Sequence, residues 1–179
     1  MNTIDDLTGF PMFPKETTSL LSKYLTSDIW TKLSETQDDF GYKFKQAIFS
    51  GCKNVDSGIG VYAGSHSSYD KFAELFDKVI EDYHGHSKTA KHNEEDYNAK
   101  INAPDFPEDE AKMIISTRIR VGRNLDNFPL GPGLTDVQRG EIESTVTNSL
   151  KQFDSELAGT YYPLNGMDAK VQQQLIEDH

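Results

Sequence analysis

The stretch SSYDKFAELFDKVIEDYHG, residues 67–85, carries the clearest signal of secondary structure in this 179-residue chain. Its apolar side chains recur every three or four positions, at Tyr69, Phe72, Leu75, Phe76, Val79, Ile80 and Tyr83. This is the 3.6-residue period of an α-helix that buries one face. Ser67 or Ser68 can cap the start and Gly85 can end the helix, so we predict one helix whose apolar stripe lies in a core.

Three shorter helical patterns come before this stretch. Their apolar positions are Leu20, Leu21, Tyr24 and Leu25, then Ile29, Trp30 and Leu33, then Phe44, Ala47 and Ile48, with Gly51 near the end of the third. Each set falls on one face of a helix. Trp30 is interpreted as a core residue, because large aromatic side chains are mostly buried. The first half of the chain is therefore predicted to be helical.

The second half of the chain has a different pattern. Residues 86–112 are polar and are interrupted by Pro104 and Pro107, which is typical of a linker. Side chains of residues 113–121 alternate between two faces and are rich in β-branched types, which predicts a strand. Thr135 and Gln138 match a capping box that opens a helix. Residues 158–164 suggest another strand and residues 168–179 another helix, so we expect a fragment, or a region that needs a partner to complete its sheet.

Composition narrows the class of protein. The net charge of −11 argues against a nucleic-acid or membrane-surface binder, because both need a basic face. The sequence has no long apolar run that predicts a membrane span, and its N-terminus lacks the pattern of a signal peptide. Cys52 is the one cysteine, so no internal disulfide is expected. These features together predict a cytoplasmic protein.

Against this acidic background, the segment STRIRVGR, residues 116–123, holds three arginines. On a strand, Ser116, Arg118 and Arg120 point to one face, with neighbours about 6.5–7 Å apart. Two guanidinium groups at that spacing suit an extended anion such as a di- or triphosphate, since arginine donates paired hydrogen bonds and keeps its charge. The alternative is that Arg118 and Arg120 form structural ion pairs with acidic residues on adjacent strands.

A second candidate site is the loop DSGIGVYAG, residues 56–64. Two glycines around a small apolar residue let the backbone approach a ligand closely, and Tyr62 adds a hydroxyl and a ring face. Such a loop can hold a small polar substrate through backbone contacts. The alternative is an ordinary connection between two helices, because a single G-x-G pattern is weak evidence. The pattern fits neither a Walker loop nor a dinucleotide fingerprint.

Four segments in this order resemble the phosphagen (guanidino) kinases. They are DSGIGVYAG, YDKFAELFDKVIEDYHG, STRIRVGRNLDNFPLGPGLT and ELAGTYYPLNGMDAKVQQQLIEDH. The resemblance implies an α+β fold, with a small all-α N-terminal domain followed by the beginning of a catalytic domain built on an antiparallel sheet. We place the guanidino-substrate domain at residues 1–95, a linker at 96–112, and the truncated ATP-binding domain at 113–179.

The resemblance also implies an activity, the reversible transfer of the γ-phosphoryl group of MgATP to a guanidino nitrogen. The short loop and Tyr62 favour L-arginine as the substrate. The implied substrate-binding residues are Ser57, Gly58, Ile59, Gly60, Val61 and Tyr62. The implied nucleotide-binding residues are Ser116, Thr117, Arg118, Ile119 and Arg120. Asp56 would join an ion pair between domains or subunits, while for Arg123 a structural role is the alternative to nucleotide binding.

Other family features are expected beyond His179, including the carboxylate that orients the guanidinium and the reactive cysteine. This chain alone is therefore expected to be inactive and to need the C-terminal half of the kinase. Members of the family occur as monomers and as homodimers. Two alternatives remain, a kinase for creatine, taurocyamine, lombricine or glycocyamine, and a non-catalytic fragment that binds substrate or a partner.

Two further features are expected to carry no catalytic chemistry, and a third is expected to change the loop. Cys52 precedes the loop and is interpreted as a small core residue. His84, His86 and His92 lie among acidic residues, but a helix end and a linker favour a solvated role over a metal site. Gly64 stands where the family often has a proline after the Tyr-Ala pair, and we expect it to make the loop more flexible.

Overall fold

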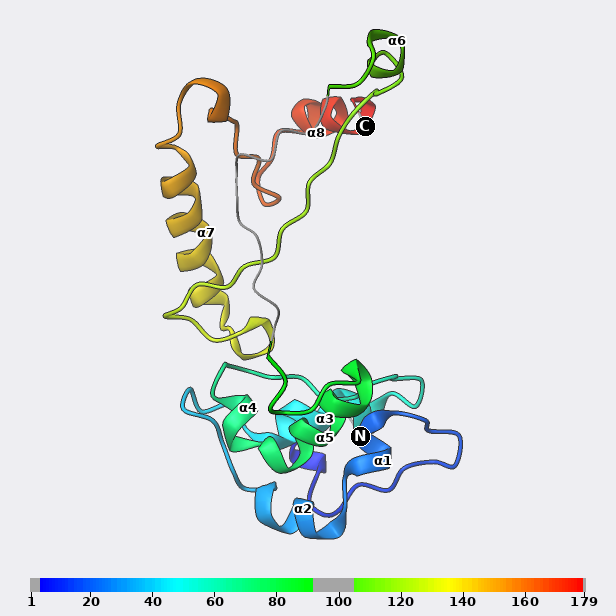
Figure 1. Cartoon of the computed structure of the whole chain (residues 1–179). Helices are drawn as coiled ribbons and strands as arrows, with labels where there is room; N and C mark the ends of the chain where they lie inside the picture. Colours follow the sequence, from blue (N-terminus) through cyan, green and yellow to red (C-terminus); the bar gives the residue numbers. More distant parts are fainter. Residues whose placement is uncertain (1–3, 92–104, 179) are drawn as a thin grey trace. The chain divides into compact units, whose positions relative to one another are not determined.

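A computed structural model describes residues 4–91 and 105–178 (Figure 1). The chain divides into two units, Met1–Gly133 and Leu134–His179, and each is described by itself. Most of the predicted linker at 96–112 lies outside the described residues, so the three domain boundaries stay a prediction. None of the described helices is long and apolar enough to cross a membrane.

The first unit is helical in its described part, and up to residue 85 this confirms the helices that the sequence predicts. Its elements are η1 (Ile4–Asp6), α1 (Leu20–Tyr24), α2 (Ser27–Leu33), α3 (Phe44–Lys53), α4 (Ser68–Lys71), α5 (Ala73–His84), α6 (Glu108–Ala111) and η2 (Gly131–Gly133). Local capping explains several of the bounds. The Ser19 hydroxyl accepts from the N–H of Ser22, and the Thr26 hydroxyl accepts from that of Ile29. Gly85 ends α5 in the left-handed conformation, with φ of 70°.

The predicted helix at 67–85 is interrupted at Phe72, which separates α4 from α5. Phe72 is fully buried, and its ring makes edge contacts with Phe44 at 5.4 Å and with Phe76 at 5.7 Å between centroids. Ser67 does occupy the N-cap position of α4, but its side chain makes no capping hydrogen bond. The apolar stripe is also only partly core, since Tyr69 and Tyr83 are exposed.

One hydrophobic core lies inside the first unit. It consists of Leu7, Leu21, Leu25, Ile29, Leu33, Tyr42, Phe44, Ala47, Ile48, Phe72, Leu75, Phe76 and Val79. Trp30 packs against this core and is partly buried. The core brings α1 against both α3 and α5, and the candidate loop follows α3 directly.

The second unit contains α7 (Asp136–Leu150), η3 (Ser155–Leu157) and α8 (Ala169–Glu177). The capping box of Thr135 and Gln138 is confirmed, since each side chain binds the backbone N–H of the other. None of these elements buries a residue.

The predicted strands at 113–121 and 158–164 do not form within the described residues, where the one β-bridge joins Gln37 and Lys43. A strand exists only through pairing with another backbone, and no described segment provides it. The β part of the predicted α+β fold is therefore not confirmed.

Candidate functional site

The loop at residues 56–64 is attached to two helices through its backbone. The carbonyl of Gly58 accepts from the N–H of Leu20 at 3.0 Å, and that of Ile59 accepts from the N–H of Leu21 at 2.9 Å. The N–H of Tyr62 donates to the carbonyl of Ala47 at 2.8 Å. The first two bonds reach α1 and the third reaches α3, so the loop lies in a defined position on the helical unit.

Two glycines allow the loop to approach α3. A Cβ atom on Gly51 would lie 2.3 Å from the carbonyl oxygen of Gly60, closer than any real contact. Gly60 has φ of 85°, and a Cβ there would lie 2.9 Å from Cβ of Leu21. Gly58 has open space around the same position. The second glycine of the G-x-G pattern therefore serves packing, while the first leaves the backbone accessible.

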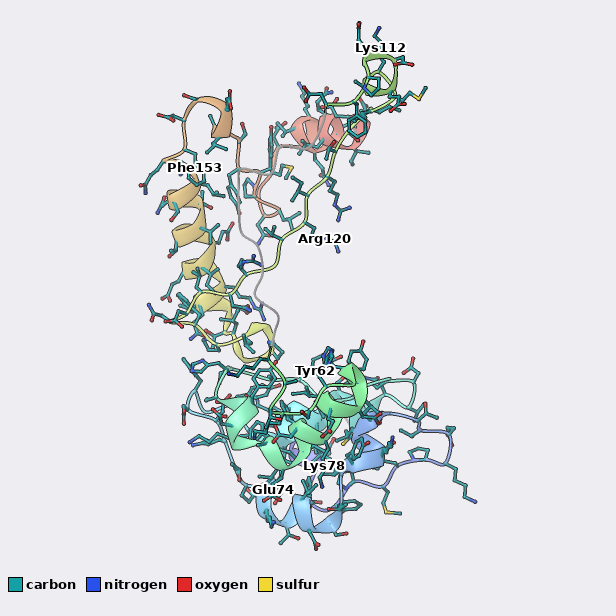
Figure 2. The ribbon with its side chains drawn as sticks, in the orientation of Figure 1. Tyr62, Glu74, Lys78, Lys112, Arg120 and Phe153 are labelled. Carbon is teal, nitrogen blue, oxygen red and sulfur yellow. The ribbon has the colours of Figure 1, made fainter. Side chains whose placement is uncertain are left out.

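An open hollow of about 580 Å³ lies beside the loop. Its lining residues are Leu20, Ser57, Gly58, Ile59, Gly60, Tyr62, Asp82 and Tyr83. Five of the six predicted substrate residues therefore lie together, while Val61 packs against the core instead. Figure 2 shows Tyr62 at the surface of the helical unit, where its ring is half exposed.

The wall of the hollow includes three residues that sequence reasoning missed, Leu20, Asp82 and Tyr83. Asp82 accepts from Nζ of Lys23 at 2.6 Å and from the hydroxyl of Tyr24 at 2.9 Å. These two hydrogen bonds, that of Lys23 first, lower the pKa of the carboxyl below its ordinary value. The one signal in the sequence was the aromatic stripe of residues 69–83, which ends at Tyr83. That stripe predicts Tyr83 in the core, whereas the residue is exposed and lines the hollow.

Gly64, at the end of the loop, is held rather than free. Its N–H donates to the Ser68 hydroxyl at 3.1 Å, and its carbonyl accepts from the N–H of Leu130 at 2.8 Å. A Cβ atom there would lie 2.0 Å from the ring of Tyr42. The expectation of a more flexible loop is therefore wrong, because this glycine leaves room for a tyrosine instead.

The predicted nucleotide residues, Ser116, Thr117, Arg118, Ile119 and Arg120, are all exposed. Within residues 4–91 and 105–178 no ion pair engages Arg118 or Arg120, and the adjacent strands that the ion-pair alternative requires do not form there, so both interpretations of these arginines stay predictions. The Arg123 guanidinium donates to the carbonyl of Gly122 at 2.7 Å. No hydrogen bond between described residues joins this segment to the loop, and Asp56 is exposed.

Cys52 lies on α3 and packs against the core, as predicted. Burial raises the pKa of its thiol from 9.0 to about 12. Such a thiol is poorly reactive, which fits a packing role. His92 lies outside the described residues, and the described ones contain no group of three His, Cys, Asp or Glu side chains arranged for a metal ion.

Comparison with known proteins identifies the origin of this arrangement. The family described as "ATP:guanido phosphotransferase, N-terminal domain" matches residues 15–81, which include the loop and most of the helical core. The chain belongs to the phosphagen kinase family. Its resemblance to that family is confirmed by these residues and by the relatives that follow.

Among curated phosphagen kinases, the chain is 45% identical over 162 residues to "Arginine kinase Lit v 2.0101" of Penaeus vannamei. That match covers 90% of this chain and 45% of the relative. The chain is also 44% identical to an arginine kinase of Callinectes sapidus, again over 90% of this chain and 45% of the relative. The chain thus spans about half the length of the curated relatives it matches.

Solved phosphagen kinases have a similar fold. A lombricine kinase matches with a TM-score of 0.75 and 26% identity, over 100% of this chain and 48% of that one. A substrate-free duplicated taurocyamine kinase from Schistosoma mansoni matches with a TM-score of 0.73 and 30% identity, over 93% of this chain and 24% of that one.

Proposed function

We propose that the protein containing this chain transfers the γ-phosphoryl group of MgATP reversibly to the guanidino group of L-arginine, giving phosphoarginine and ADP. The observation that carries this proposal is the 44–45% identity to arginine kinases over nine-tenths of the chain. In this proposal the protein is cytoplasmic and buffers cellular energy.

The loop supports a role in binding the amino-acid end of the substrate. Among the described residues, the backbone N–H groups of Gly58, Ile59, Gly60 and Val61 have no hydrogen-bond acceptor. A row of such donors suits a carboxylate. The hydroxyls of Ser57 and Tyr62 complete the proposed substrate site, and the hollow beside them accommodates a small polar molecule.

The arginine segment supports a role in nucleotide binding. Arg118 and Arg120 are exposed and alternate in sequence, which fits two guanidinium groups on one polyphosphate. Ser116, Thr117 and Ile119 would lie beside the phosphates, and MgATP supplies the transferred group. In this proposal residues 113–121 and 158–164 become strands of an antiparallel sheet, completed by the C-terminal half of the kinase, and Asp56 pairs across a domain or subunit boundary.

The chemistry explains why two separate sites are needed. A guanidinium group is a poor nucleophile, so nitrogen, phosphorus and leaving oxygen must be held in line. Arginine side chains stabilise negative charge on the transferring group, and closure excludes the water that would hydrolyse ATP. The helical unit would position the guanidine, while the arginine segment would hold the nucleotide.

The experiment that tests the proposal is an ADP-coupled assay with MgATP and arginine, creatine, taurocyamine or lombricine in turn. It is run on this chain and on the chain extended to the length of its relatives. We expect turnover with arginine in the extended protein and none in this chain. An extended protein that uses no guanidine would overturn the proposal.

Two substitutions in the extended protein separate the two sites. Tyr62→Ala should raise the KM for arginine more than the KM for ATP, because the ring borders the hollow proposed for the guanidino substrate. Arg120→Ala should reduce kcat/KM for ATP by about a hundredfold or more, as expected for loss of a charge-stabilising group. Equal KM changes for Tyr62→Ala, or unchanged nucleotide use for Arg120→Ala, would contradict the respective assignment.

A second candidate is a kinase for another guanidine. It is favoured by the likeness of the fold to a lombricine kinase and a taurocyamine kinase. The same substrate panel decides between the candidates, since turnover with one of those compounds and not arginine would select the second.

A further inference from the structure

We propose that Asp38 is a positioning residue that fixes the C-terminal end of the loop at residues 56–64 and thereby sets the affinity for the guanidino substrate. The effect on substrate affinity rests on the function proposed above. Asp38 lies outside the loop and the hollow, on the connection between α2 and α3.

Asp38 is a buried carboxylate whose two oxygens are both occupied. Asp38 is only 4% exposed. Oδ1 accepts from the backbone N–H of Phe40 at 3.0 Å and of Tyr42 at 2.9 Å. Oδ2 accepts from the hydroxyls of Ser65 at 2.7 Å and Ser68 at 2.6 Å. Four hydrogen-bond donors therefore compensate for the desolvation of the Asp38 carboxylate. Burial without these donors would destabilise its charged form.

The two serines transmit this anchor to the loop. The Ser68 hydroxyl donates to Asp38 and accepts from the N–H groups of Gly64 and Ser65, each at 3.1 Å. The Ser65 hydroxyl donates to Asp38 and contacts the hydroxyl of Ser67, which accepts from the N–H of Asp39. We call Asp38, Ser65, Ser67 and Ser68 the Asp38 cluster. It ties the residue two positions after Tyr62 to a fixed charge.

Tyr42 connects the same carboxylate to the packing of the loop. Its N–H donates to Asp38, and its ring occupies the space that a Cβ on Gly64 would need. Because Asp38 fixes the backbone at Tyr42, it also fixes the surface on which Gly64 rests. The start of the loop is held by α1, its middle by α3, and its end by the Asp38 cluster.

Replacing the carboxylate with an amide of the same shape isolates this role. In Asp38→Asn, one amide orientation points NH₂ at the hydroxyl of Ser68, which already accepts two N–H bonds. The other orientation points NH₂ at the N–H groups of Phe40 and Tyr42. In either orientation the new NH₂ group faces groups that themselves donate hydrogen bonds. The hydrogen bonds on that side of residue 38 must therefore break. Asp39→Asn is the matched control, since Asp39 is exposed and its carboxylate forms an ion pair with Lys71 at 2.9 Å.

The first experiment measures amide hydrogen exchange by NMR in this chain. In Asp38→Asn, exchange at Gly64 and Ser65 should accelerate about tenfold or more relative to Val79 in α5, the size expected when hydrogen bonds to a charged group are lost. Asp39→Asn should leave that ratio unchanged. Equal acceleration at Gly64 and Val79 would mean only global destabilisation and would overturn the proposal. If Asp38→Asn does not fold, Ser65→Ala removes a single donor to Asp38 and is read by the same ratio.

The second experiment measures kinetics in the extended kinase. Asp38→Asn should raise the KM for the guanidino substrate about threefold to tenfold, with the KM for ATP and kcat changed less than about twofold. Accelerated exchange with an unchanged guanidine KM would reduce Asp38 to a structural residue and overturn its role in affinity. An extended protein without any guanidino kinase activity would contradict the proposed function and the role in affinity, while the exchange result still decides whether Asp38 fixes the loop.

Discussion

The two described regions differ in what their helices bury. Residues 4–91 place thirteen apolar side chains in one core, whereas α7 and α8 bury no residue. Local signals are equally good in both, because Thr26 caps α2 and Thr135 caps α7 through the same type of hydrogen bond. The difference teaches that caps and helix propensity determine where helices begin, while the stability of a region depends on contacts between distant segments.

The largest expected effect is on the core. Phe72→Ala should destabilise the helical region by about 3–5 kcal/mol, because it removes a fully buried ring between Phe44 and Phe76 and leaves a cavity. The measurement is urea unfolding followed by the fluorescence of Trp30, which packs against this core.

Phe153→Ala is the matched control in the other region, since Phe153, which Figure 2 labels, is a residue 51% exposed. It should change the unfolding free energy by less than about 0.5 kcal/mol. A similar loss for both variants would remove the distinction between the regions.

Glycine substitutions give a smaller effect of opposite sign in the two regions. Gly51→Ala should cost about 1–3 kcal/mol, since its Cβ would meet the backbone of Gly60 at 2.3 Å. Gly140→Ala in α7 should stabilise that helix by about 0.5–1 kcal/mol, because open space surrounds the position and alanine favours a helix. Thermal melts followed by circular dichroism compare the two variants. A stable Gly51→Ala variant would show that the loop can move away from α3.

These contrasts define what the sequence could predict. The periodic spacing of apolar residues gave the helices of the first half, and the capping box gave the start of α7, because both signals are local. The break at Phe72 was missed because that residue fits the helical period, while its burial depends on Phe44, which is distant in sequence. Asp38 was missed for the same reason, since its partners Ser65 and Ser68 are 27 and 30 residues away.

The site was predictable only in part for a related reason. Ser57 and Tyr62 lie close together in the sequence, and both line the hollow. Asp82 and Tyr83 are distant in sequence and line it because α5 packs against α1. The segment around Arg118 has the alternation of a strand, yet a strand needs a partner that no described residue supplies. Its role as a nucleotide site stays a prediction.

Acid titration tests the buried charge of the helical region. Burial acts to raise the pKa of Asp38, but hydrogen bonds from Ser68, Ser65 and two backbone N–H groups outweigh it and lower the pKa below the ordinary 3.8. A lowered folded-state pKa gives stability that is present above about pH 4 and lost as pH falls through the folded value. Tyr42, the titratable side chain beside it, has its pKa raised to about 12 and stays neutral in this range.

Asp38→Asn should therefore be less stable than the unmodified chain at pH 7, by about 1–3 kcal/mol, and the gap should shrink below pH 4. Urea midpoints measured from pH 7 to pH 2 give the size of the gap. Asp39→Asn, at an exposed position, should show a smaller gap at pH 7. A gap for Asp38→Asn that is constant with pH would mean that the charge of Asp38 contributes nothing to stability.

Thiol reactivity tests the same contrast between the two regions through the burial of a single side chain. The pKa of Cys52 rises from 9.0 to about 12, so the thiolate fraction at pH 8 falls by about three orders of magnitude, and the higher nucleophilicity of a basic thiolate recovers about half of this on a logarithmic scale. Iodoacetamide should therefore react at least about thirtyfold more slowly with the folded chain than with the urea-unfolded chain. Ser144→Cys in a Cys52→Ser background places a thiol on the exposed surface of α7, where folding should change the rate less than about threefold. Because both thiols lie on helices, a difference between them reports burial and not secondary structure. Equal protection of the two would show that the region around α7 buries its helices in solution.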